Sequence, residues 1–167
     1  MIAFTEFDAL ARDAHKDNRG VAVGALIANP QNQIFCQRRS ATRSLFPNRW
    51  DIVGGHVDPG EALDAALVRE TLEETGWHIK TIGPLVHTAE WPERTLMGDV
   101  IVREFDFIVS INGDIQNPFL ENGKVTTSTW VDRSNLDMLQ DTLDGSISTI
   151  YLSVLAALDY LDQRHTL

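Results

Sequence analysis

The amino-acid sequence predicts an α/β fold in which helices cover both faces of a sheet. Strand-like runs are interleaved along the chain with runs whose apolar residues recur at helical spacing. Elements interleaved on this scale pack as a sheet between layers of helix. The length of 167 residues is that of one ordinary domain, and the chain contains no internal repeat or low-complexity linker. We therefore expect residues 1–167 to form a single domain.

The first elements are expected to be a helix and a hairpin. Residues 5–14 predict the helix, because phenylalanine, leucine and alanine side chains recur on one of its faces. Two strand-like runs follow at 21–28 and 34–38. The turn-forming residues 29–32 separate them, so we expect the two strands to pair with each other.

A glycine-rich loop over residues 53–60 leads into a predicted helix over 61–75. Gly76 stands where a left-handed residue commonly ends a helix. The helix carries an apolar stripe at spacing i, i+3, i+7 and, on another side, two leucines that flank its glutamates. We expect apolar contacts on both of these sides. The stripe is Ala65, Val68 and Leu72, and the leucines are Leu63 and Leu67.

Three further strands and a last helix complete the predicted fold. The strands are expected at 82–88, 100–109 and 127–131. The helix is expected at about 146–163, where apolar residues recur at helical spacing. These residues are Ile147, Ile150, Tyr151, Val154, Leu158 and Leu161. We expect this helix to pack on the sheet and consider a homodimer contact as an additional role.

Composition and charge exclude several classes of protein. No apolar stretch approaches the roughly 18 residues needed to span a bilayer, and the first residues lack the pattern of a signal peptide, so we expect a cytoplasmic protein without a membrane partner. The formal net charge of −10 argues against general nucleic-acid binding, which needs a basic face. Cys36 is the only cysteine and is expected to be buried and inert.

Three glutamates in the predicted helix 61–75 indicate a cation site. Glu70, Glu73 and Glu74 stand at i, i+3 and i+4, so their carboxylates project from one face. Like charges at this spacing repel, and a cation between them relieves the repulsion. Hard oxygen ligands suit Mg²⁺, with Mn²⁺ as a second choice. A solvated acidic face is the alternative for three glutamates alone.

The segment around these glutamates resembles the Nudix box, G-x5-E-x7-R-E-U-x-E-E-x-G-U, where U is a bulky apolar residue. Residues 55–77 read GHVDPGEALDAALVRETLEETGW. One position departs from the pattern: Thr71 stands where an aliphatic residue is usual. Eight positions match it: Gly55, Glu61, Arg69, Glu70, Glu73, Glu74, Gly76 and Trp77. The flanking segments 37–39, 46–51 and 54–57 also resemble family members.

The resemblance implies a fold, a reaction and a metal site. The family fold is an α/β/α sandwich, a central mixed β-sheet flanked by helices. Members of this MutT-like superfamily hydrolyse a nucleoside diphosphate linked to another group, using divalent metal and an activated water. By motif position, Glu73 and Glu74 are expected as principal metal ligands, Glu70 as a further ligand or the group that orients the water, and the carbonyl of Gly54 or Gly55 as an additional ligand.

The resemblance also implies roles for an arginine and a general base. Arg69 is expected to pair with Glu61 and so to orient the catalytic glutamates. Family members often recruit the general base from outside the box. We assign this role to Glu121, in a loop before the last strand, with Glu90 and Glu104 as competitors.

Positive charge is concentrated just before the box. Arg38, Arg39, Arg43 and Arg49 lie within twelve residues, although the chain has only fourteen Lys and Arg in all. Arginine binds phosphate oxygens in pairs, so we expect Arg38, Arg39 and Arg49 in particular to bind substrate. Trp91 is a candidate for stacking on a base or sugar.

Two other functions remain as alternatives. A non-catalytic nucleotide-binding or regulatory module would share the fold, but the Arg-Glu-x-x-Glu-Glu core is intact here. In isoprenoid diphosphate isomerases, a branch of the superfamily, a catalytic cysteine precedes the Gly-His pair, where this chain has Gly54.

The nucleotide-like substrate stays open among oxidised deoxynucleoside triphosphates, dinucleoside polyphosphates and nucleotide sugars. Pro92, fifteen residues after Trp77, resembles its placement in members that hydrolyse ADP-ribose.

Overall fold

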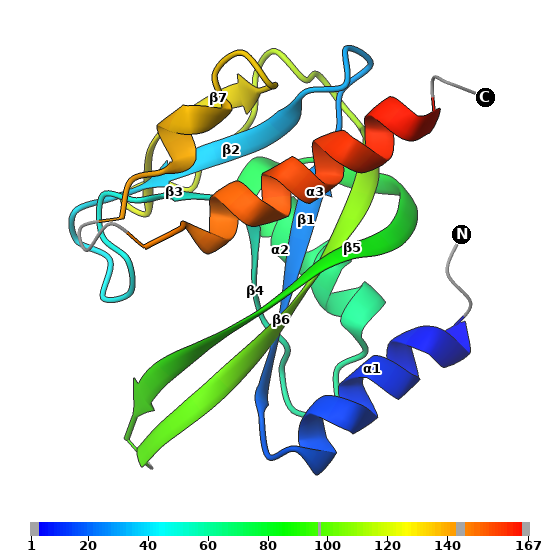
Figure 1. The fold of residues 1–167 in the computed structure, drawn as a ribbon, viewed down its shortest axis with the longest axis vertical. Coiled ribbons are helices and arrows are strands. Elements are labelled where there is room, and N and C mark those ends of the chain that lie inside the picture. Colours follow the sequence, from blue (N-terminus) through cyan, green and yellow to red (C-terminus); the bar gives the residue numbers. More distant parts are fainter. Residues whose placement is uncertain (1–3, 97, 143–145, 165–167) are drawn as a thin grey trace.

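The computed structural model describes residues 4–96, 98–142 and 146–164. Within these ranges the chain forms two sheets, three α-helices and one short 3-10 helix (Figure 1). The helices are α1 (Phe4–Lys16), α2 (Leu63–Thr75), η1 (Leu136–Leu139) and α3 (Thr149–Arg164). The strands are β1 (Gly20–Ile27), β2 (Ile34–Arg39), β3 (Trp50–Asp51), β4 (Val53–His56), β5 (His78–Thr95), β6 (Gly98–Asn112) and β7 (Val125–Val131).

The larger sheet is mixed and has the strand order β4-β1-β6-β5. β1 runs parallel to β6 and antiparallel to β4, and β5 pairs with β6 as a long twisted hairpin that extends to the lower left in Figure 1. Seven of the eight residues of β1 are buried, because this strand is central and apolar on both faces. The smaller sheet is antiparallel, with the order β3-β2-β7.

The expected pairing of β1 with β2 is wrong. The two strands meet at a single bridge between Ala28 and Ile34, beyond which they enter different sheets. The turn itself forms as expected: the side chain of Asn29 accepts hydrogen bonds from the backbone N–H of Gln31 and of Gln33. Both edges of β1 are occupied by β4 and β6, so β2 has no free edge of β1 to join.

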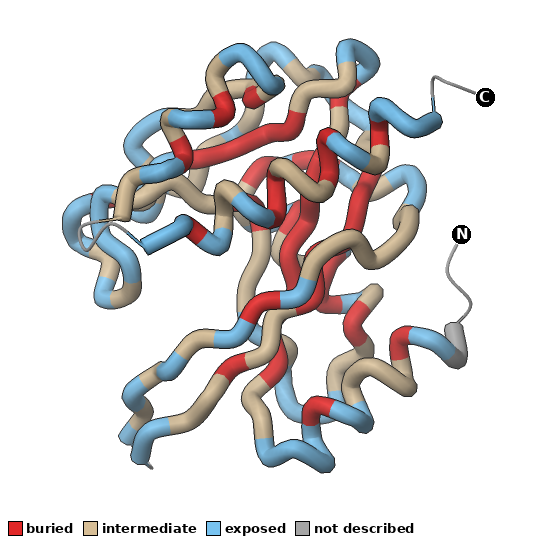
Figure 2. The backbone as a smooth tube through the Cα atoms, viewed as in Figure 1, coloured by how far each residue is buried: buried red, intermediate tan, exposed pale blue. Residues whose placement is uncertain are grey.

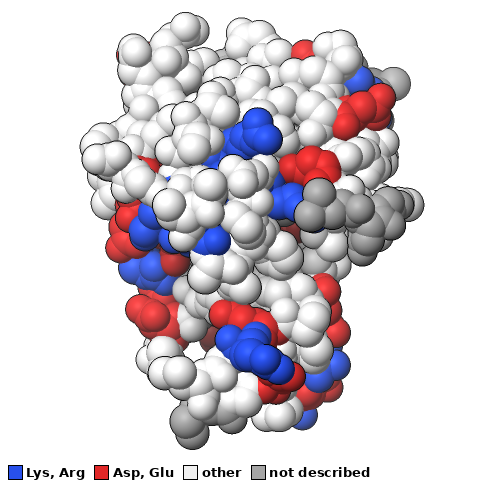
Figure 3. Space-filling view, turned by 90° about the vertical axis from the view of Figure 1, so that its left-hand side faces the viewer, with Lys and Arg blue, Asp and Glu red and all other residues white. Residues whose placement is uncertain are grey.

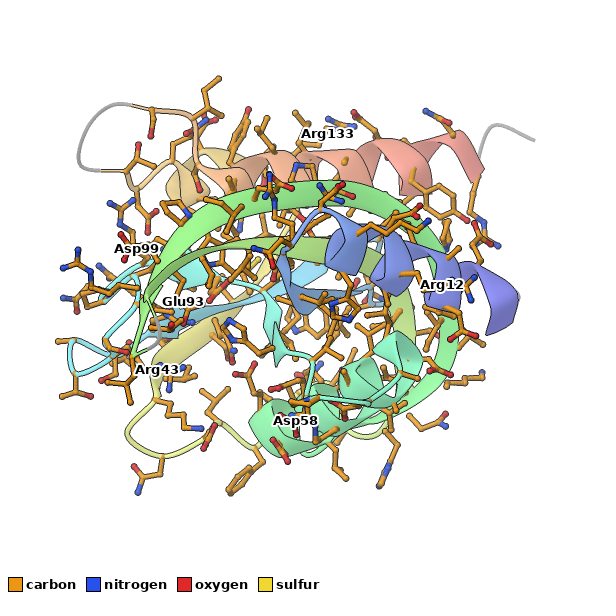
Figure 4. The ribbon with its side chains drawn as sticks, turned by 90° about the horizontal axis from the view of Figure 1, so that it is seen from below. Arg12, Arg43, Asp58, Glu93, Asp99 and Arg133 are labelled. Carbon is orange, nitrogen blue, oxygen red and sulfur yellow. The ribbon has the colours of Figure 1, made fainter. Side chains whose placement is uncertain are left out.

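Helices cover both faces of the larger sheet, which confirms the predicted α/β class. α1 and α2 pack on one face, where Phe7 and Leu67 contact the core around Val23 and Phe105. α3 packs on the other face through Val154 and Leu158, against residues that include Leu26 and Ile108. Figure 4 shows α3 and α2 on opposite sides of the strands, and Figure 2 shows the buried segments running between them. None of the described helices is long and apolar enough to cross a membrane.

The buried face of α2 is only in part the predicted one: Leu63 and Leu67 are buried as expected, but the apolar stripe is exposed. Val68 and Leu72 are 45% and 41% exposed, and Ala65 is exposed too. The helix packs on the short strand β4, and this contact turns the acidic face toward the sheet, so the residues beside the glutamates are buried instead. They are Leu63, Ala66, Leu67, Thr71 and Thr75. The departure from the family pattern, Thr71, is thus a core residue, and its hydroxyl oxygen is buried without a hydrogen-bond partner.

Element boundaries differ from the sequence-based ones mainly in β5 and α3. Pro92 and its neighbours lie in β5 rather than in a loop, with Pro92 opposite Ile101. β5 is an edge strand, where a residue without an N–H is tolerated. α3 begins at Thr149, and Ile147 precedes it with 63% of its surface exposed. Residues 143–145, near the predicted start of this helix, lie outside the described residues. Gly76 ends α2 in the left-handed region, with φ 71°, as expected.

Candidate active site

Arg69 organises the acidic face of α2. Its Nε and Nη2 donate to the two carboxylate oxygens of Glu61 at 2.9 and 2.8 Å, so the expected pair is present and bidentate. Glu61 precedes the helix, and the same guanidinium also donates to the carbonyl oxygen of His56 at 3.0 Å. The hydrogen bonds from Arg69 lower the pKa of Glu61 below its ordinary value. Arg69 therefore ties the glycine-rich loop to the middle of α2.

The same guanidinium reaches two of the three expected ligands. Arg69 Nη1 donates to Glu70 Oε1 at 2.6 Å and lies 3.6 Å from Glu73 Oε2. Glu70 is largely buried, with 15% of its side chain exposed, whereas Glu73 is 57% exposed. Glu73 is thus the carboxylate that can turn to a ligand without leaving a buried position.

Glu74 points inward, toward β2 and β4. Its Oε2 accepts a hydrogen bond from Gln37 Nε2 at 2.7 Å and one from the backbone N–H of Gly54 at 3.2 Å. Burial, with the nearby negative charge of Asp51, raises the pKa of Glu74 to about 7. At neutral pH this carboxyl is therefore about half protonated when no cation is near.

Gly55 lets α2 approach β4 this closely, and Gly54 lets β4 pack closely against β1. A Cβ on Gly55 would lie 2.5 Å from Glu70 Oε1, and a Cβ on Gly54 would lie 2.2 Å from the carbonyl oxygen of Val23. Both distances are shorter than side chains allow. The absence of side chains at Gly54 and Gly55 leaves their backbone next to the glutamates of α2.

The donor set of this region fits a hard divalent cation. Glutamate carboxylates and backbone carbonyls supply only oxygen, the ligand type that Mg²⁺ and Mn²⁺ prefer. Burial raises the pKa of Glu74, and the charges of Asp51 and Glu70 raise it further; a cation beside Glu74 would oppose these effects. Within the described residues, no group of three or more His, Cys, Asp or Glu side chains is placed closely enough to hold one ion.

A cavity of about 370 Å³ lies beside this region, between the larger sheet and the start of α3. Gly54 and Gly55 contribute to its wall, so it adjoins the acidic face of α2. It combines aromatic, acidic and basic side chains, including Trp50, Trp91, Glu104, Arg39, Arg43 and Arg49. Trp91 thus lies at the cavity, as the stacking role requires.

Three of the four clustered arginines line this cavity, and Arg38 does not. Arg39 Nη1 donates to Asp51 Oδ2 at 2.6 Å, and Arg49 Nη1 lies 3.8 Å from Asp141 Oδ1. Arg38 is exposed, and its Nε donates to the carbonyl oxygen of Asn48 at 3.1 Å. In Figure 4, Arg43 lies on the same side of the molecule as Glu93. Charges of both signs are interspersed on the face drawn in Figure 3, so the arginines do not form one broad basic field.

The structure separates the three candidates for the general base. Glu121 pairs with Lys124 at 2.6 Å and is not among the cavity residues, so its catalytic role stays a prediction. Glu90 accepts hydrogen bonds from Arg103 at 2.7 Å and Arg19 at 3.2 Å, which lower its pKa. Glu104 lines the cavity, and burial together with the charge of Asp106 raises its pKa well above the ordinary value.

Two residues at the site were missed by the sequence reasoning. Gln37 holds Glu74, and Asp51 holds Arg39. Both lie in segments that resemble family members, and they are opposite each other in the β2–β3 pairing. Their contacts bring together positions far apart in the chain, so no local periodicity marked them.

Comparison with known proteins agrees with this geometry. The family profile described as NUDIX domain matches residues 18–151. An m7GpppN-mRNA hydrolase from Xenopus laevis is 41% identical over 66 residues, 38% of this chain and 22% of that protein. A nucleoside triphosphatase from Klebsiella pneumoniae is 38% identical over 69 residues, 41% of this chain and 45% of that protein. The chain spans between 22% and 51% of the length of the first curated relatives that it matches.

Solved structures share the fold. The crystal structure of a MutT NUDIX hydrolase from Burkholderia pseudomallei superposes with a TM-score of 0.62 at 20% identity, over 83% of this chain and 97% of that one. The profile match extends over most of the chain and includes every motif residue described above. The chain belongs to the NUDIX domain family.

Proposed function

We propose that this protein is a Mg²⁺-dependent hydrolase that cleaves a diphosphate linkage in a nucleoside diphosphate derivative. One observation carries the proposal. Arg69 and Glu74 connect the acidic face of α2 to β4, and Gly54 and Gly55 of β4 also line a cavity that contains arginines and tryptophans. The proposed cation site thus adjoins a cavity that suits a phosphate-containing ligand with an aromatic ring.

Glu70, Glu73, Glu74 and the carbonyl of Gly54 would hold the metal. When bound, Mg²⁺ or Mn²⁺ neutralises phosphate charge and makes a nearby water more acidic. Gln37 and the N–H of Gly54 keep Glu74 in place through its Oε2. Arg69 fixes Glu70, which we propose orients the attacking water.

Arg39 and Arg49 are proposed to bind the phosphate oxygens. Both line the cavity, and each is positioned by an aspartate that leaves part of its guanidinium fork free for a ligand. Arg43 lines the same cavity and adds positive charge there. Binding by Arg38, which lies outside the cavity lining, stays a prediction.

The relatives support the nucleotide class of the substrate. One is named for hydrolysis of capped mRNA and another for hydrolysis of nucleoside triphosphates, and both compounds contain phosphoric anhydrides. An isoprenoid diphosphate isomerase is the poorer fit. Cys36 is buried, its burial raises the pKa of the thiol, and Gly54 stands where that branch carries its cysteine.

A hydrolysis screen tests the proposal. The intact chain, with Mg²⁺ or Mn²⁺, is incubated with ADP-ribose, nucleotide sugars, dinucleoside polyphosphates and oxidised deoxynucleoside triphosphates, and the products are identified. Cleavage at a phosphoric anhydride in at least one compound, abolished by chelator, is expected. Binding without turnover in all four classes would instead favour a non-catalytic module. Cytoplasmic location and a homodimer stay predictions.

A further inference from the structure

Phe46, in the loop between β2 and β3, has an unfavourable backbone conformation (the cyan loop at the left of Figure 1). Its φ of 47° lies in the left-handed region, where the side chain of a bulky residue crowds the backbone. Pro47 follows it and disfavours helical conformations of either hand at the preceding residue. The other described residues with positive φ are glycines and asparagines, which tolerate this region. Phe46 is therefore strained.

Two arginines of β2 impose this conformation on the loop. Arg39 Nε donates to the carbonyl oxygen of Leu45 at 3.0 Å. Arg38 Nε donates to the carbonyl oxygen of Asn48 at 3.1 Å. These two carbonyls lie on either side of Phe46 in the chain, and β2 is itself paired along both edges, with β3 and β7. Strain persists only where the surroundings over-determine it, and such strain is concentrated at sites that bind ligands.

The ring of Phe46 lies at the cavity and is left half-exposed there. Phe46 lines the cavity, yet 49% of its surface is exposed. Among the residues that the structure describes, no aromatic ring contacts it, and it belongs to neither buried apolar cluster. Phe119, the other exposed phenylalanine, is neither strained nor part of the cavity lining. Strain and exposure both disfavour Phe46 in the unliganded fold, so we expect the partner of its ring to be a ligand.

The same loop supplies a group that suits phosphate. Arg49 lines the cavity, with its Nη1 3.8 Å from Asp141 Oδ1. Its backbone N–H donates to the carbonyl oxygen of Phe46 at 3.4 Å, so the two residues are joined in one turn. An aromatic side chain stacks on any nucleobase, because every base has a π face. A ligand with a phosphate and a flat ring can therefore contact this one loop with both parts.

We propose that Phe46 is a specificity-determining residue, on which the flat ring of a nucleotide-like ligand stacks while Arg49 binds its phosphate. This inference rests on the proposed function for the nucleotide class of the ligand. Phe46 selects ligands that carry an aromatic ring over those that carry only sugar and phosphate, and it does not distinguish one base from another. Because the loop is fixed before the ligand arrives, less conformational freedom is lost on binding.

Thermal unfolding tests the strain. Asparagine adopts the left-handed conformation more readily than phenylalanine, so Phe46→Asn is expected to unfold at a temperature at least as high as the wild type. Phe46→Tyr keeps both the ring and the strain, and it should unfold at the wild-type temperature. A lower unfolding temperature of Phe46→Asn would show that the ring stabilises the unliganded fold, and it would overturn the inference.

Equilibrium binding tests the ring contact apart from hydrolysis. The dissociation constants of AMP, GMP and ribose 5-phosphate, which contain no phosphoric anhydride, are measured calorimetrically for the wild type, Phe46→Tyr and Phe46→Asn. The wild type and Phe46→Tyr are expected to bind both nucleotides roughly tenfold more tightly than ribose 5-phosphate, the scale of one base–aromatic stack. In Phe46→Asn this preference should fall to about twofold, with the affinity for ribose 5-phosphate unchanged.

Controls separate the possible failures. Phe119→Asn, the same substitution at an exposed phenylalanine outside the cavity lining, should change none of the three constants. Circular dichroism confirms that each variant folds. An unchanged preference in Phe46→Asn, or a wild type that binds neither nucleotide more tightly than ribose 5-phosphate, would overturn the inference and leave the hydrolase proposal intact. A preference that Phe46→Asn loses, in a protein that hydrolyses none of the compounds screened, would uphold the inference and refute the proposed function.

Discussion

The carboxyl group that Arg69 binds most closely and the buried carboxyl groups of the cavity beside α3 have pKa values shifted in opposite directions. Around Arg69 one guanidinium contacts three glutamates, and the pKa of Glu61 is lowered. In the cavity, Arg39 pairs with Asp51, and the pKa values of Asp51 and Glu104 are raised, chiefly by burial. The hydrogen bonds of a guanidinium favour the ionised form of Glu61, whereas burial raises the pKa of Asp51 even though Arg39 lies beside it.

Glu74 lies between the two regions and tests the comparison most strongly. Glu74→Gln and Glu73→Gln should each lower kcat by at least about 10²-fold, because charge stabilisation of the transition state is lost while the shape is nearly kept. Steady-state kinetics at saturating Mg²⁺ measure the effect. Glu6→Gln, an exposed glutamate of α1, is the matched control and should retain full activity. Near-normal turnover of either ligand variant would refute the metal assignment.

Substitution of the arginines that line the cavity tests whether the cavity binds phosphate. Arg39→Ala and Arg49→Ala should raise KM by roughly tenfold, about 1.4 kcal/mol, with a smaller change in kcat, and the effect should weaken as salt is raised. Arg12→Ala is the matched control, because this arginine is exposed on α1 and lies outside the cavity lining, and it should change KM less than twofold. An equal effect of all three substitutions would mean that position in the cavity is irrelevant.

The raised pKa of Glu74 predicts how stability depends on pH. Its ordinary value of 4.5 applies to the unfolded chain, and the folded value is about 7, so the folded state binds the proton more tightly. The resulting stabilisation is fully present below pH 4.5 and is lost as the pH rises through about 7, by up to about 3 kcal/mol. Urea unfolding in the presence of chelator measures the free energy of unfolding of the wild type and of Glu74→Gln. The wild-type value minus the Glu74→Gln value should fall as the pH rises over this interval. A difference that grows with pH would contradict the assignment.

The smallest expected effect concerns self-association. The apolar face of α3 is covered by the sheet, so a homodimer through this helix would depend on outward residues such as Leu152, which is 38% exposed. Sedimentation equilibrium at micromolar concentration, for the wild type and Leu152→Asp, measures the mass. A dimer that the substitution dissociates is the predicted result, and a wild-type monomer would remove the dimer prediction.

Local spacing along one helix accounts for what the sequence determined by itself. The distances between Glu70, Glu73 and Glu74 follow from helical geometry, as does the end of α2 at Gly76. The pair of Arg69 with Glu61 was foreseen from the family motif, and the structure confirms it. The α/β class followed from the order of apolar runs, because each run must bury its own face against another element.

Only the tertiary structure decided the rest, because it depends on which strands and faces meet. The apolar pattern of β1 does not determine whether β2 pairs with it. In the structure, β4 and β6 occupy both edges of β1, so β2 pairs elsewhere. Likewise, Glu70 of α2 packs against β4 because Gly55 has no side chain at that point. The pKa of Glu104 is raised by burial, by Asp106 and by Asp51, which lies on another strand. A carboxyl group's protonation depends on neighbours that long-range folding supplies, and no short stretch of sequence contains them.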